Sequence, residues 1–417
     1  MSDLMRSVID NFYMSDGISK YFIVKHHTVP PLSSSLHYSN AMFEGMSILG
    51  VKKGGSIRLG LFHPALNFER LRYDLASLGF RWELYSDEQI IESIFTVCAL
   101  NGWNKKIELE NEDTLIQSEY GDYHRIYVRP LVYARNNAIG LRAKQSLELM
   151  NCLVPMGEYI SGDPTGINVM LFPTPRTLAF PNYKASSNYQ LSIHALHRMT
   201  EYNERNDIQC NEVIFENIRG NITEGSGENV VMIRDNELIT PPVSEGALPG
   251  ITYRIAFMVA EEMGLKVSFG TFKYEDIDSA ECMFLTGNAA GLVPIKKVVK
   301  VDNHFNTVDY METKEGGNNP LFRKLHSEYS KISLGDTSYG EFFTYLDEWF
   351  DESRLDELNL LGIEFKKRLA AEEDRYIGTN TRISSYLEIP PKIMVVRKYF
   401  ENKKWMLERL GISRFLK

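Results

Sequence analysis

The chain has 417 residues, of which 43% are hydrophobic and 24% charged. This length and balance are typical of a globular protein of two or three domains with sizeable cores. The net charge of −9 argues against wholesale nucleic-acid binding. Four scattered cysteines, without paired spacing, argue against a zinc site or a disulfide framework and fit a reducing compartment.

The start of the chain has neither the basic segment nor the long apolar segment of a secretory signal. The sequence contains no run of about twenty apolar residues, so no membrane span is expected. A soluble, cytoplasmic protein is therefore expected, with no nucleic-acid or membrane partner.

Residues 1–155 are expected to form a small α/β domain. Stretches 21–25, 56–62 and 124–135 are rich in β-branched and aromatic residues and predict strands. Residues 64–79 carry apolar residues at helical spacing, with a proline at the start and a glycine at the end, and predict a helix. The polar stretch 101–122 is expected to be an extended loop or an insertion.

Residues 156–165, rich in Gly, Pro and Ser, predict an interdomain linker. Residues 166–350 predict a larger domain, with strands at 166–172, 211–217, 229–234 and 281–286 and the clearest helix at 251–263. Residues 351–417 are charged and helical in pattern, with a break at Pro390-Pro391, and predict a helical C-terminal extension. This extension is expected to pack on the body or at a dimer interface; docking of a partner is the alternative.

Chemistry is predicted from an ordered set of short motifs. Lys184 lies in K-A-S-S-N-Y, and Glu224 lies in T-E-G-S-G-E-N, where the glycines let backbone pass close to a flat ligand. The motif A-L-P-G-I-T places Ile251 and Thr252 at a helix entrance, where unpaired amides bind phosphate. The motif T-G-N-A-A-G around Asn288 offers a second nest of amide donors.

Taken singly, these residues favour ordinary explanations: a surface lysine or arginine, a hairpin glutamate and a capped helix. Together with the upstream Arg70, however, they are the parts needed to hold pyridoxal 5'-phosphate. The amine bonds the aldehyde, the carboxylate keeps the ring nitrogen protonated, and the arginine and glycine-rich turns take the phosphate. The sequence therefore predicts an enzyme that uses this cofactor.

These motifs, with H-Y-S-N-A-M-F-E-G (37–45), N-F-E-R-L and Y-V-R-P-L, resemble fold-type IV pyridoxal-phosphate enzymes, the class IV aminotransferases. Within that class they are most similar to the branched-chain amino-acid aminotransferases, over about residues 15–345. The resemblance implies a two-domain α/β (α+β) fold of the D-amino-acid aminotransferase type and a homodimer. It also implies that an amino group is transferred between L-glutamate and a branched-chain or other hydrophobic 2-oxo acid, by a ping-pong Schiff-base mechanism. The implied setting is amino-acid biosynthesis.

The resemblance assigns roles to individual residues. Seven are implied to hold the cofactor: Lys184 as Schiff-base lysine and proton shuttle, Glu224 on the ring nitrogen, Tyr189 on the phenolic oxygen, and Arg70, Ile251, Thr252 and Asn288 on the phosphate. Five are implied to bind the substrate: Tyr127 and the Ala289 backbone at the α-carboxylate, Arg129 at the side-chain carboxylate of glutamate, and Tyr38 and Phe43 around the side chain.

Three departures from the family pattern leave the substrate open. Ser47 stands where bacterial members often carry an arginine, Asn288 stands where threonine or serine is usual, and the loop 134–141 differs from the usual version. The alternatives are another fold-type IV activity (aminodeoxychorismate lyase, D-amino-acid or amine transaminase) or a non-catalytic relative acting as a scaffold. His194 and His197 lie one helical turn apart, but with no evident third ligand they favour a helix surface, and no metal is expected.

Overall fold

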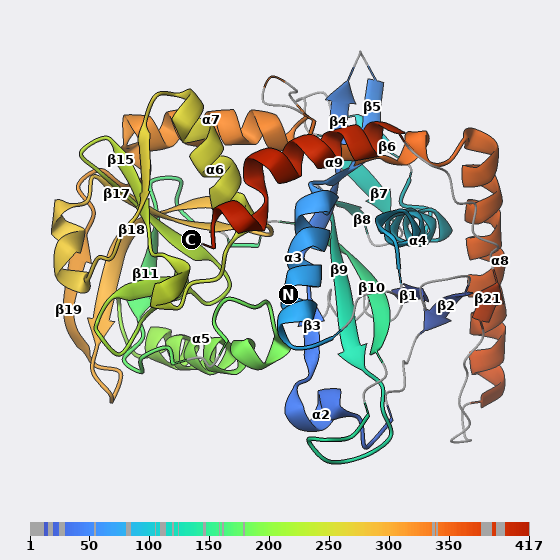
Figure 1. Cartoon of the computed structure of the whole chain (residues 1–417), viewed down its shortest axis with the longest axis horizontal. Helices are drawn as coiled ribbons and strands as arrows, with labels where there is room; N and C mark the ends of the chain where they lie inside the picture. The colour runs from blue at the N-terminus through green and yellow to red at the C-terminus, as the bar shows by residue number, and fades with distance from the viewer. Residues whose placement is uncertain are drawn as a thin grey trace. The chain divides into compact units, whose positions relative to one another are not determined.

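The structure is a computed structural model. It describes residues 12–15, 20–24, 30–53, 56–80, 85–104, 106–108, 114–118, 121–123, 125–144, 147–157, 159–160, 162–177, 180–335, 338, 341–376, 386–388 and 397–416. The chain forms two compact units (Figure 1). The first comprises Met1–Gly157 and Gly340–Met406, and the second comprises Glu158–Tyr339 and Leu407–Lys417. Within the described ranges, no helix is long and apolar enough to cross a membrane.

The first unit is built on an antiparallel sheet of six strands in the order β10-β9-β4-β5-β20, with β3 also paired to β9. These strands are β3 (Ala41–Phe43), β4 (Met46–Lys53), β5 (Ser56–Phe62), β9 (Arg125–Ala134), β10 (Leu147–Met156) and β20 (Phe343–Tyr345). The accompanying helices are α2 (Ser34–Tyr38), α3 (Pro64–Ser77), α4 (Asp87–Leu100), α8 (Glu352–Tyr376) and most of α9 (Arg397–Leu410).

Two small antiparallel sheets complete this unit. One contains β1 (Phe12–Ser15), β2 (Lys20–Val24) and β21 (Tyr386–Glu388), and the other contains β6 (Lys106–Glu108), β7 (Thr114–Ser118) and β8 (Gly121–Tyr123). The strands predicted at 21–25, 56–62 and 124–135 are β2, β5 and β9, and the helix predicted at 64–79 is α3. The prediction of an extended loop at 101–122 is wrong, because consecutive short segments there pair with one another and satisfy their own backbone hydrogen bonds.

The second unit is built on a nine-stranded sheet in the order β13-β12-β11-β18-β17-β14-β15-β16, with β19 paired to β18. The strands are β11 (Ile167–Leu171), β12 (Glu212–Glu216), β13 (Ile222–Gly225), β14 (Asn229–Arg234), β15 (Glu237–Thr240), β16 (Lys266–Phe269), β17 (Cys282–Gly287), β18 (Gly291–Val301) and β19 (Thr307–Glu312). The helices are α5 (Tyr189–Asn203), α6 (Ile251–Glu262) and α7 (Pro320–Ser333). The predicted strands and the predicted helix of this region therefore correspond to β11, β12, β14, β17 and α6.

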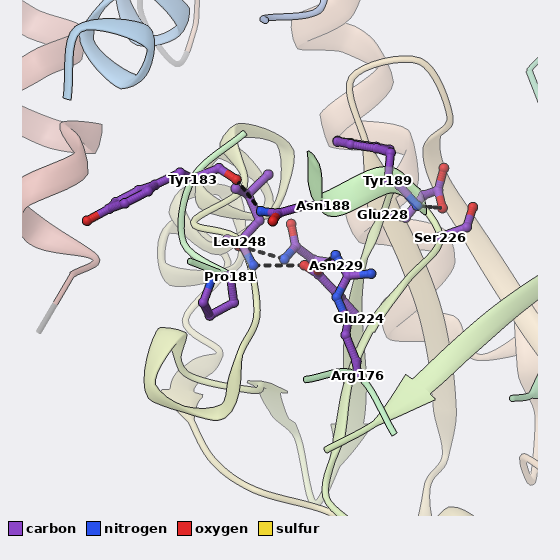
Figure 2. A pocket seen from close by; sticks show the side chains of 11 residues that line it. Arg176, Pro181, Tyr183, Asn188, Tyr189, Glu224, Ser226, Glu228, Asn229 and Leu248 are labelled. Atoms are coloured by element: carbon purple, nitrogen blue, oxygen red, sulfur yellow. Dashed lines mark hydrogen bonds and ion pairs between the residues drawn. The ribbon is translucent and has the colours of Figure 1, made fainter. Parts of the chain in front are cut away.

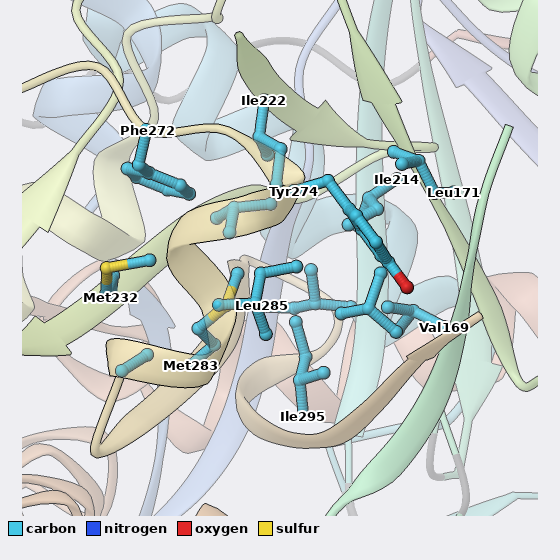
Figure 3. Close-up of a cluster of buried hydrophobic side chains, with 14 of the residues drawn as sticks. Val169, Leu171, Ile214, Ile222, Met232, Phe272, Tyr274, Met283, Leu285 and Ile295 are labelled. Atoms are coloured by element: carbon cyan, nitrogen blue, oxygen red, sulfur yellow. The ribbon is translucent and has the colours of Figure 1, made fainter. Parts of the chain in front are cut away.

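Alternating side chains bury both faces of this sheet. Val169 and Leu171 of β11 enter one apolar cluster (Figure 3), whereas Met170 enters a second cluster on the other face. This is the two-residue period of a strand, applied to a sheet with apolar neighbours on both sides. Helix α5 closes the second face with Ala195 and Met199. The strand ends and the loops that follow them are thereby fixed, and these carry the candidate site.

The C-terminal extension contains α8 and α9, while the predicted break at Pro390-Pro391 lies outside the described residues. Helix α8 passes so close to the end of α4 that a Cβ at Gly362 would lie 1.8 Å from the carbonyl oxygen of Leu100. The first turns of α9 attach to Asp87 in the first turn of α4. Tyr399 Oη and Lys403 Nζ each donate to Asp87 Oδ2 at 2.6 Å.

A buried polar network lies beneath α3. His63, just before that helix, is fully buried, and its Nδ1 lies 2.7 Å from Asn67 Oδ1. Asn67 in turn donates to Glu44 Oε2 at 2.7 Å, and Arg70 pairs with the same carboxylate. Burial lowers the pKa of His63 to about 4 from its usual 6.5, although the bond to Asn67 opposes the shift.

We expect His63 to make stability depend on pH. Its folded pKa lies below its unfolded pKa, so the stabilisation is complete above about 6.5 and is lost as the pH falls towards 4. Across that pH window the free energy of unfolding falls by about 3 kcal/mol at most. Urea unfolding at a series of pH values should show a shallower acid slope for His63→Gln than for the wild type. His304→Gln, at an exposed position, is the control and should keep the wild-type slope; an unchanged slope in His63→Gln would contradict the assignment.

Candidate active site

Lys184 lies in a short loop that is closed by the motif following it. Its Nζ donates to Tyr189 Oη at 2.8 Å, and Tyr189 is the first residue of α5. The Asn188 amide donates to the carbonyls of Phe180 and Tyr183, at 2.9 and 2.8 Å, and so holds both sides of the loop. The sequence K-A-S-S-N-Y thus supplies the amine, the clamp and the phenol together.

Glu224 in β13 is a buried carboxylate with two strong donors (Figure 2). Its Oε1 lies 2.6 Å from Arg176 Nη2, and its Oε2 accepts from the backbone N–H of Leu248 at 2.8 Å. Both side chains of the ion pair are only 7% exposed. These donors stabilise the charged carboxylate in a place where water is largely excluded. Glu224, Tyr189 and Arg176 line the same pocket.

The loop between Glu224's partner Leu248 and helix α6 is fixed at close range. Asn229 Nδ2 donates to the Leu248 carbonyl at 2.7 Å, and a Cβ at Gly250 would lie 2.0 Å from Asn229 Oδ1. Gly250 is the residue before α6 and has no capping side chain, so the first amides of the helix remain available to an anion. Glycine is required here because the backbone passes so close to Asn229.

Thr252 and Asn288 come together from different elements. Thr252 lies in the first turn of α6, and Asn288 lies in the turn between β17 and β18. Thr252 Oγ1 donates to Asn288 Oδ1 at 2.8 Å. Ala289 is half-buried in that same turn, and Ile251 is the first residue of α6. The two motifs A-L-P-G-I-T and T-G-N-A-A-G are therefore neighbours, as their predicted shared role in phosphate binding requires.

Two further carboxylates, Glu212 and Glu228, are buried near this pocket. Burial raises the pKa of both carboxyl groups above the usual value, and the nearby charge of Glu212 raises the pKa of Glu228 further. The charge of Lys184 acts in the opposite direction on Glu228. Glu228 also accepts from the N–H of Gly227 at 3.0 Å. Glu228, which lines the pocket, is therefore shifted towards its protonated form.

The other predicted residues belong to the first unit. Arg70, in α3, is buried and forms a bidentate pair with Glu44, with Nε–Oε1 at 2.6 Å and Nη2–Oε2 at 2.8 Å. Its predicted phosphate role remains a prediction. Tyr38 ends α2, is 40% exposed, and accepts from the N–H of Gly140 at 3.1 Å.

Phe43, Tyr127 and Arg129 form a cluster on β3 and β9. The Arg129 guanidinium lies 4.4 Å above the ring of Phe43, and its Nη2 donates to Tyr127 Oη at 2.9 Å. A Cβ at Gly45 would lie 2.3 Å from Tyr127 Oη, so the glycine of F-E-G makes room for this phenol. Ser47, opposite Tyr127 on β4, is buried. The cluster offers a cation, a hydroxyl and an apolar surface side by side.

The structure thus groups the predicted residues within each unit and adds some that sequence reasoning missed. Arg176 is the main addition, because an isolated arginine in F-P-T-P-R-T has no periodicity or motif to mark it. Glu228 stands in the motif T-E-G-S-G-E-N, and only its burial, which the sequence does not show, marks it as part of the site. His194 and His197 are both exposed on α5.

The residues present fit pyridoxal 5'-phosphate. A partly buried lysine amine is held by a phenol, a buried carboxylate is held ready to accept from a ring N–H, and a helix entrance kept open by Gly250 offers amides to a phosphate. A site of this kind, on a mixed α/β fold, defines the class of pyridoxal-phosphate enzymes.

Residues 60–298, more than half of the chain, match the family described as amino-transferase class IV. The chain belongs to this family, which confirms the resemblance and the enzyme class predicted from the motifs. Similar curated proteins include the branched-chain-amino-acid aminotransferase of Escherichia coli (strain K12), 26% identical over 315 residues. That match covers 73% of this chain and 88% of the relative. A probable branched-chain-amino-acid aminotransferase of Staphylococcus epidermidis (strain ATCC 12228) is 24% identical over 326 residues, covering 75% and 82%.

Solved structures share the fold. The branched-chain aminotransferase from Thermoproteus uzoniensis with norvaline has a TM-score of 0.62 and 23% identity, and the match covers 79% of this chain and 99% of that one. The branched-chain amino acid aminotransferase from Thermobaculum terrenum in its PLP form has a TM-score of 0.64 and 20% identity, covering 81% and 98%. The predicted fold class is confirmed.

We expect Arg176→Met to destabilise the protein by about 3 kcal/mol, because it leaves the Glu224 charge buried without its guanidinium. Adding Glu224→Gln should restore part of the loss, and the double-variant cycle measures the coupling. The control is Arg135→Met, which breaks the Arg135–Glu148 pair, whose side chains are 42% and 30% exposed, and should cost less than about 1 kcal/mol. Equal losses for the two arginines in urea unfolding would contradict the assignment.

Proposed function

We propose that the chain is a pyridoxal-phosphate aminotransferase that moves an amino group between L-glutamate and a 2-oxo acid with a branched-chain or other hydrophobic side chain. The main support is that Tyr189, which accepts a hydrogen bond from the Lys184 amine, lines the same pocket as the buried Glu224–Arg176 pair. The branched-chain substrate is supported by the names of the similar curated proteins. Transfer proceeds in two half-reactions, with glutamate leaving as its 2-oxo acid before the acceptor binds.

Lys184 and its neighbours carry the proton chemistry. When bound, pyridoxal 5'-phosphate supplies an electron sink for the negative charge that develops at the substrate Cα. The Lys184 amine holds the cofactor and moves a proton at that carbon, and Tyr189 orients this amine through their hydrogen bond. Glu224 is assigned to the ring nitrogen, where its carboxylate would accept from the ring N–H, and Arg176 orients Glu224 through their ion pair.

The phosphate is assigned to the first turn of α6 and its neighbours. Ile251 and Thr252 contribute helix-entrance amides and a hydroxyl, and Asn288 contributes its amide, which can replace the hydroxyl usual at this position. Arg70 is also assigned to the phosphate, with its guanidinium oriented by Glu44. Each of these ligands is neutral or positive towards an anionic group.

The substrate is assigned to the cluster on β3 and β9 and to the turn at Ala289. Tyr127 and the Ala289 backbone receive the α-carboxylate, and Arg129 receives the side-chain carboxylate of glutamate. Phe43 and Tyr38 line the side-chain pocket and accept an apolar side chain in its place. Because Arg129 lies over the ring of Phe43, a cation and an apolar surface are offered in one place.

We further propose that the enzyme is a cytoplasmic homodimer. Two-fold dimers are the commonest soluble oligomers, and class IV members build their sites with loops from both subunits. The four cysteines are unbridged thiols, as suits a reducing compartment.

A donor–acceptor matrix on the purified protein tests the function. Amino donors and 2-oxo acids are combined pairwise, product chirality is measured, and cofactor absorbance is followed during single half-reactions. The proposed function predicts that L-glutamate and at least one aliphatic or aromatic L-amino acid convert the cofactor to its amine form. A D-product, consumption of a substrate without a 2-oxo acid, or no turnover with any pair would instead favour the alternative activities or a scaffold.

We expect Arg129→Met to discriminate between donors. Loss of the guanidinium should lower kcat/KM for L-glutamate by about tenfold or more, because a charge-assisted contact is lost, and should affect L-leucine by less than about threefold. Stopped-flow half-reactions with each donor measure the two effects separately. Arg205→Met, at an exposed position on the chain after α5, is the control. Equal losses with both donors would rule out this role for Arg129.

A further inference from the structure

Arg254 is a buried arginine one turn into helix α6. Its exposed fraction is 0%, and every residue from Ile251 to Ala260 is likewise buried. A buried charge costs several kcal/mol unless polar partners surround it. Two of its partners are backbone carbonyls that belong to very different parts of the chain, Gly250 and Leu410.

The first carbonyl belongs to the phosphate end of the proposed site. Arg254 Nε donates to the Gly250 oxygen at 3.2 Å, and Gly250 is the residue immediately before Ile251 and Thr252. The same loop is held on its other side by Glu224, which accepts from the N–H of Leu248. Arg254 therefore holds the residue before α6 through its carbonyl, while Glu224, which lines the pocket, holds the same loop through the N–H of Leu248.

The second carbonyl belongs to the C-terminal extension. Arg254 Nη1 donates to the Leu410 oxygen at 2.6 Å, and Leu410 is the last residue of α9, where the helix dipole is negative. The guanidinium also lies 5.4 Å from the ring centre of Phe415. Figure 1 shows the end of α9 alongside α6. The family match ends at residue 298, so this contact comes from outside the matched region.

The last residues of the chain are anchored along the same helix. Arg409 pairs with Glu262, Arg414 Nη2 lies 3.3 Å from Glu261 Oε2, and the Phe415 ring meets Tyr253 edge-on at 6.0 Å. A cavity of about 180 Å³, partly lined by Phe269 and Phe415, borders this junction. The directed bonds of Arg254 therefore add to the packing and the ion pairs that hold the segment on α6.

We propose that Arg254 is a positioning residue through which the C-terminal segment Leu410–Phe415 holds the entrance of α6 in the geometry that binds the cofactor phosphate. The segment supplies the Leu410 carbonyl and the Phe415 ring, and Arg254 connects them to the Gly250 carbonyl. Because Ile251 and Thr252 come directly after Gly250, their amides are positioned as well. The extension is thereby part of the cofactor site without touching the cofactor. This inference rests on the proposed function.

The test compares two ligands that differ only in the phosphate. Full-length wild type, Arg254→Met and Phe415→Ala are freed of cofactor and titrated with pyridoxal 5'-phosphate and, separately, with pyridoxal, and absorbance reports binding. We expect both variants to raise the dissociation constant of pyridoxal 5'-phosphate by about tenfold or more. The dissociation constant of pyridoxal should change by less than about threefold. Arg409→Ala, which breaks the exposed pair to Glu262 on the same helix, is the matched control and should stay within about twofold for both ligands.

Phe415→Leu keeps an apolar side chain and provides a folded variant should the alanine variant unfold. It should show the same phosphate-specific loss, and hydrogen exchange of the backbone amides from Ile251 to Arg254 should speed up. Equal weakening of both ligands, or unchanged binding with unchanged exchange, would overturn the inference. If the wild type itself binds no pyridoxal 5'-phosphate at Lys184, the proposed function has failed. If the wild type binds and the variants match it, only the role of Arg254 has failed.

Discussion

The second unit is organised around one buried charge, the carboxylate of Glu224. A carboxylate that is nearly excluded from water must be met by donors, and here these are the guanidinium of Arg176 and the amide of Leu248. Because Arg176 follows β11, Glu224 lies on β13 and Leu248 leads to α6, satisfying this charge fixes three separate segments together. The same contacts fix Glu224, which is proposed to meet the cofactor's ring nitrogen, and the loop before α6.

From that loop the constraints extend in two directions. Towards the pocket, the loop around Lys184 is closed by the Asn188 amide, and the amine is oriented by a phenol at the start of α5. Away from the pocket, the start of α6 is held through Arg254 by the end of the chain. A reactive amine and an anion site need fixed positions relative to each other, and the fold achieves this with backbone carbonyls and amides more than with side-chain pairs.

Sequence reasoning succeeded where a signal is local. Helix α3 is marked by Pro64 and Gly79, strands such as β11 are marked by β-branched runs, and the motif K-A-S-S-N-Y carries its amine, clamp and phenol within six residues. It failed where the signal depends on distant partners. In the sequence, Arg176 and Arg254 resemble ordinary arginines, because their partners Glu224 and Leu410 are distant along the chain. Strands β6 to β8 pair with one another in a stretch too polar to suggest a sheet.

We propose that Lys184 carries the cofactor. Borohydride reduction of the protein loaded with pyridoxal 5'-phosphate, followed by proteolysis and mass spectrometry, tests it most directly, because reduction fixes the pyridoxyl group to whichever amine holds it. We expect a single pyridoxyl group on Lys184, and we expect Lys184→Ala to lose both this group and the absorbance of the bound cofactor. A protein that takes up no cofactor, or a pyridoxyl group on any other lysine, would contradict it.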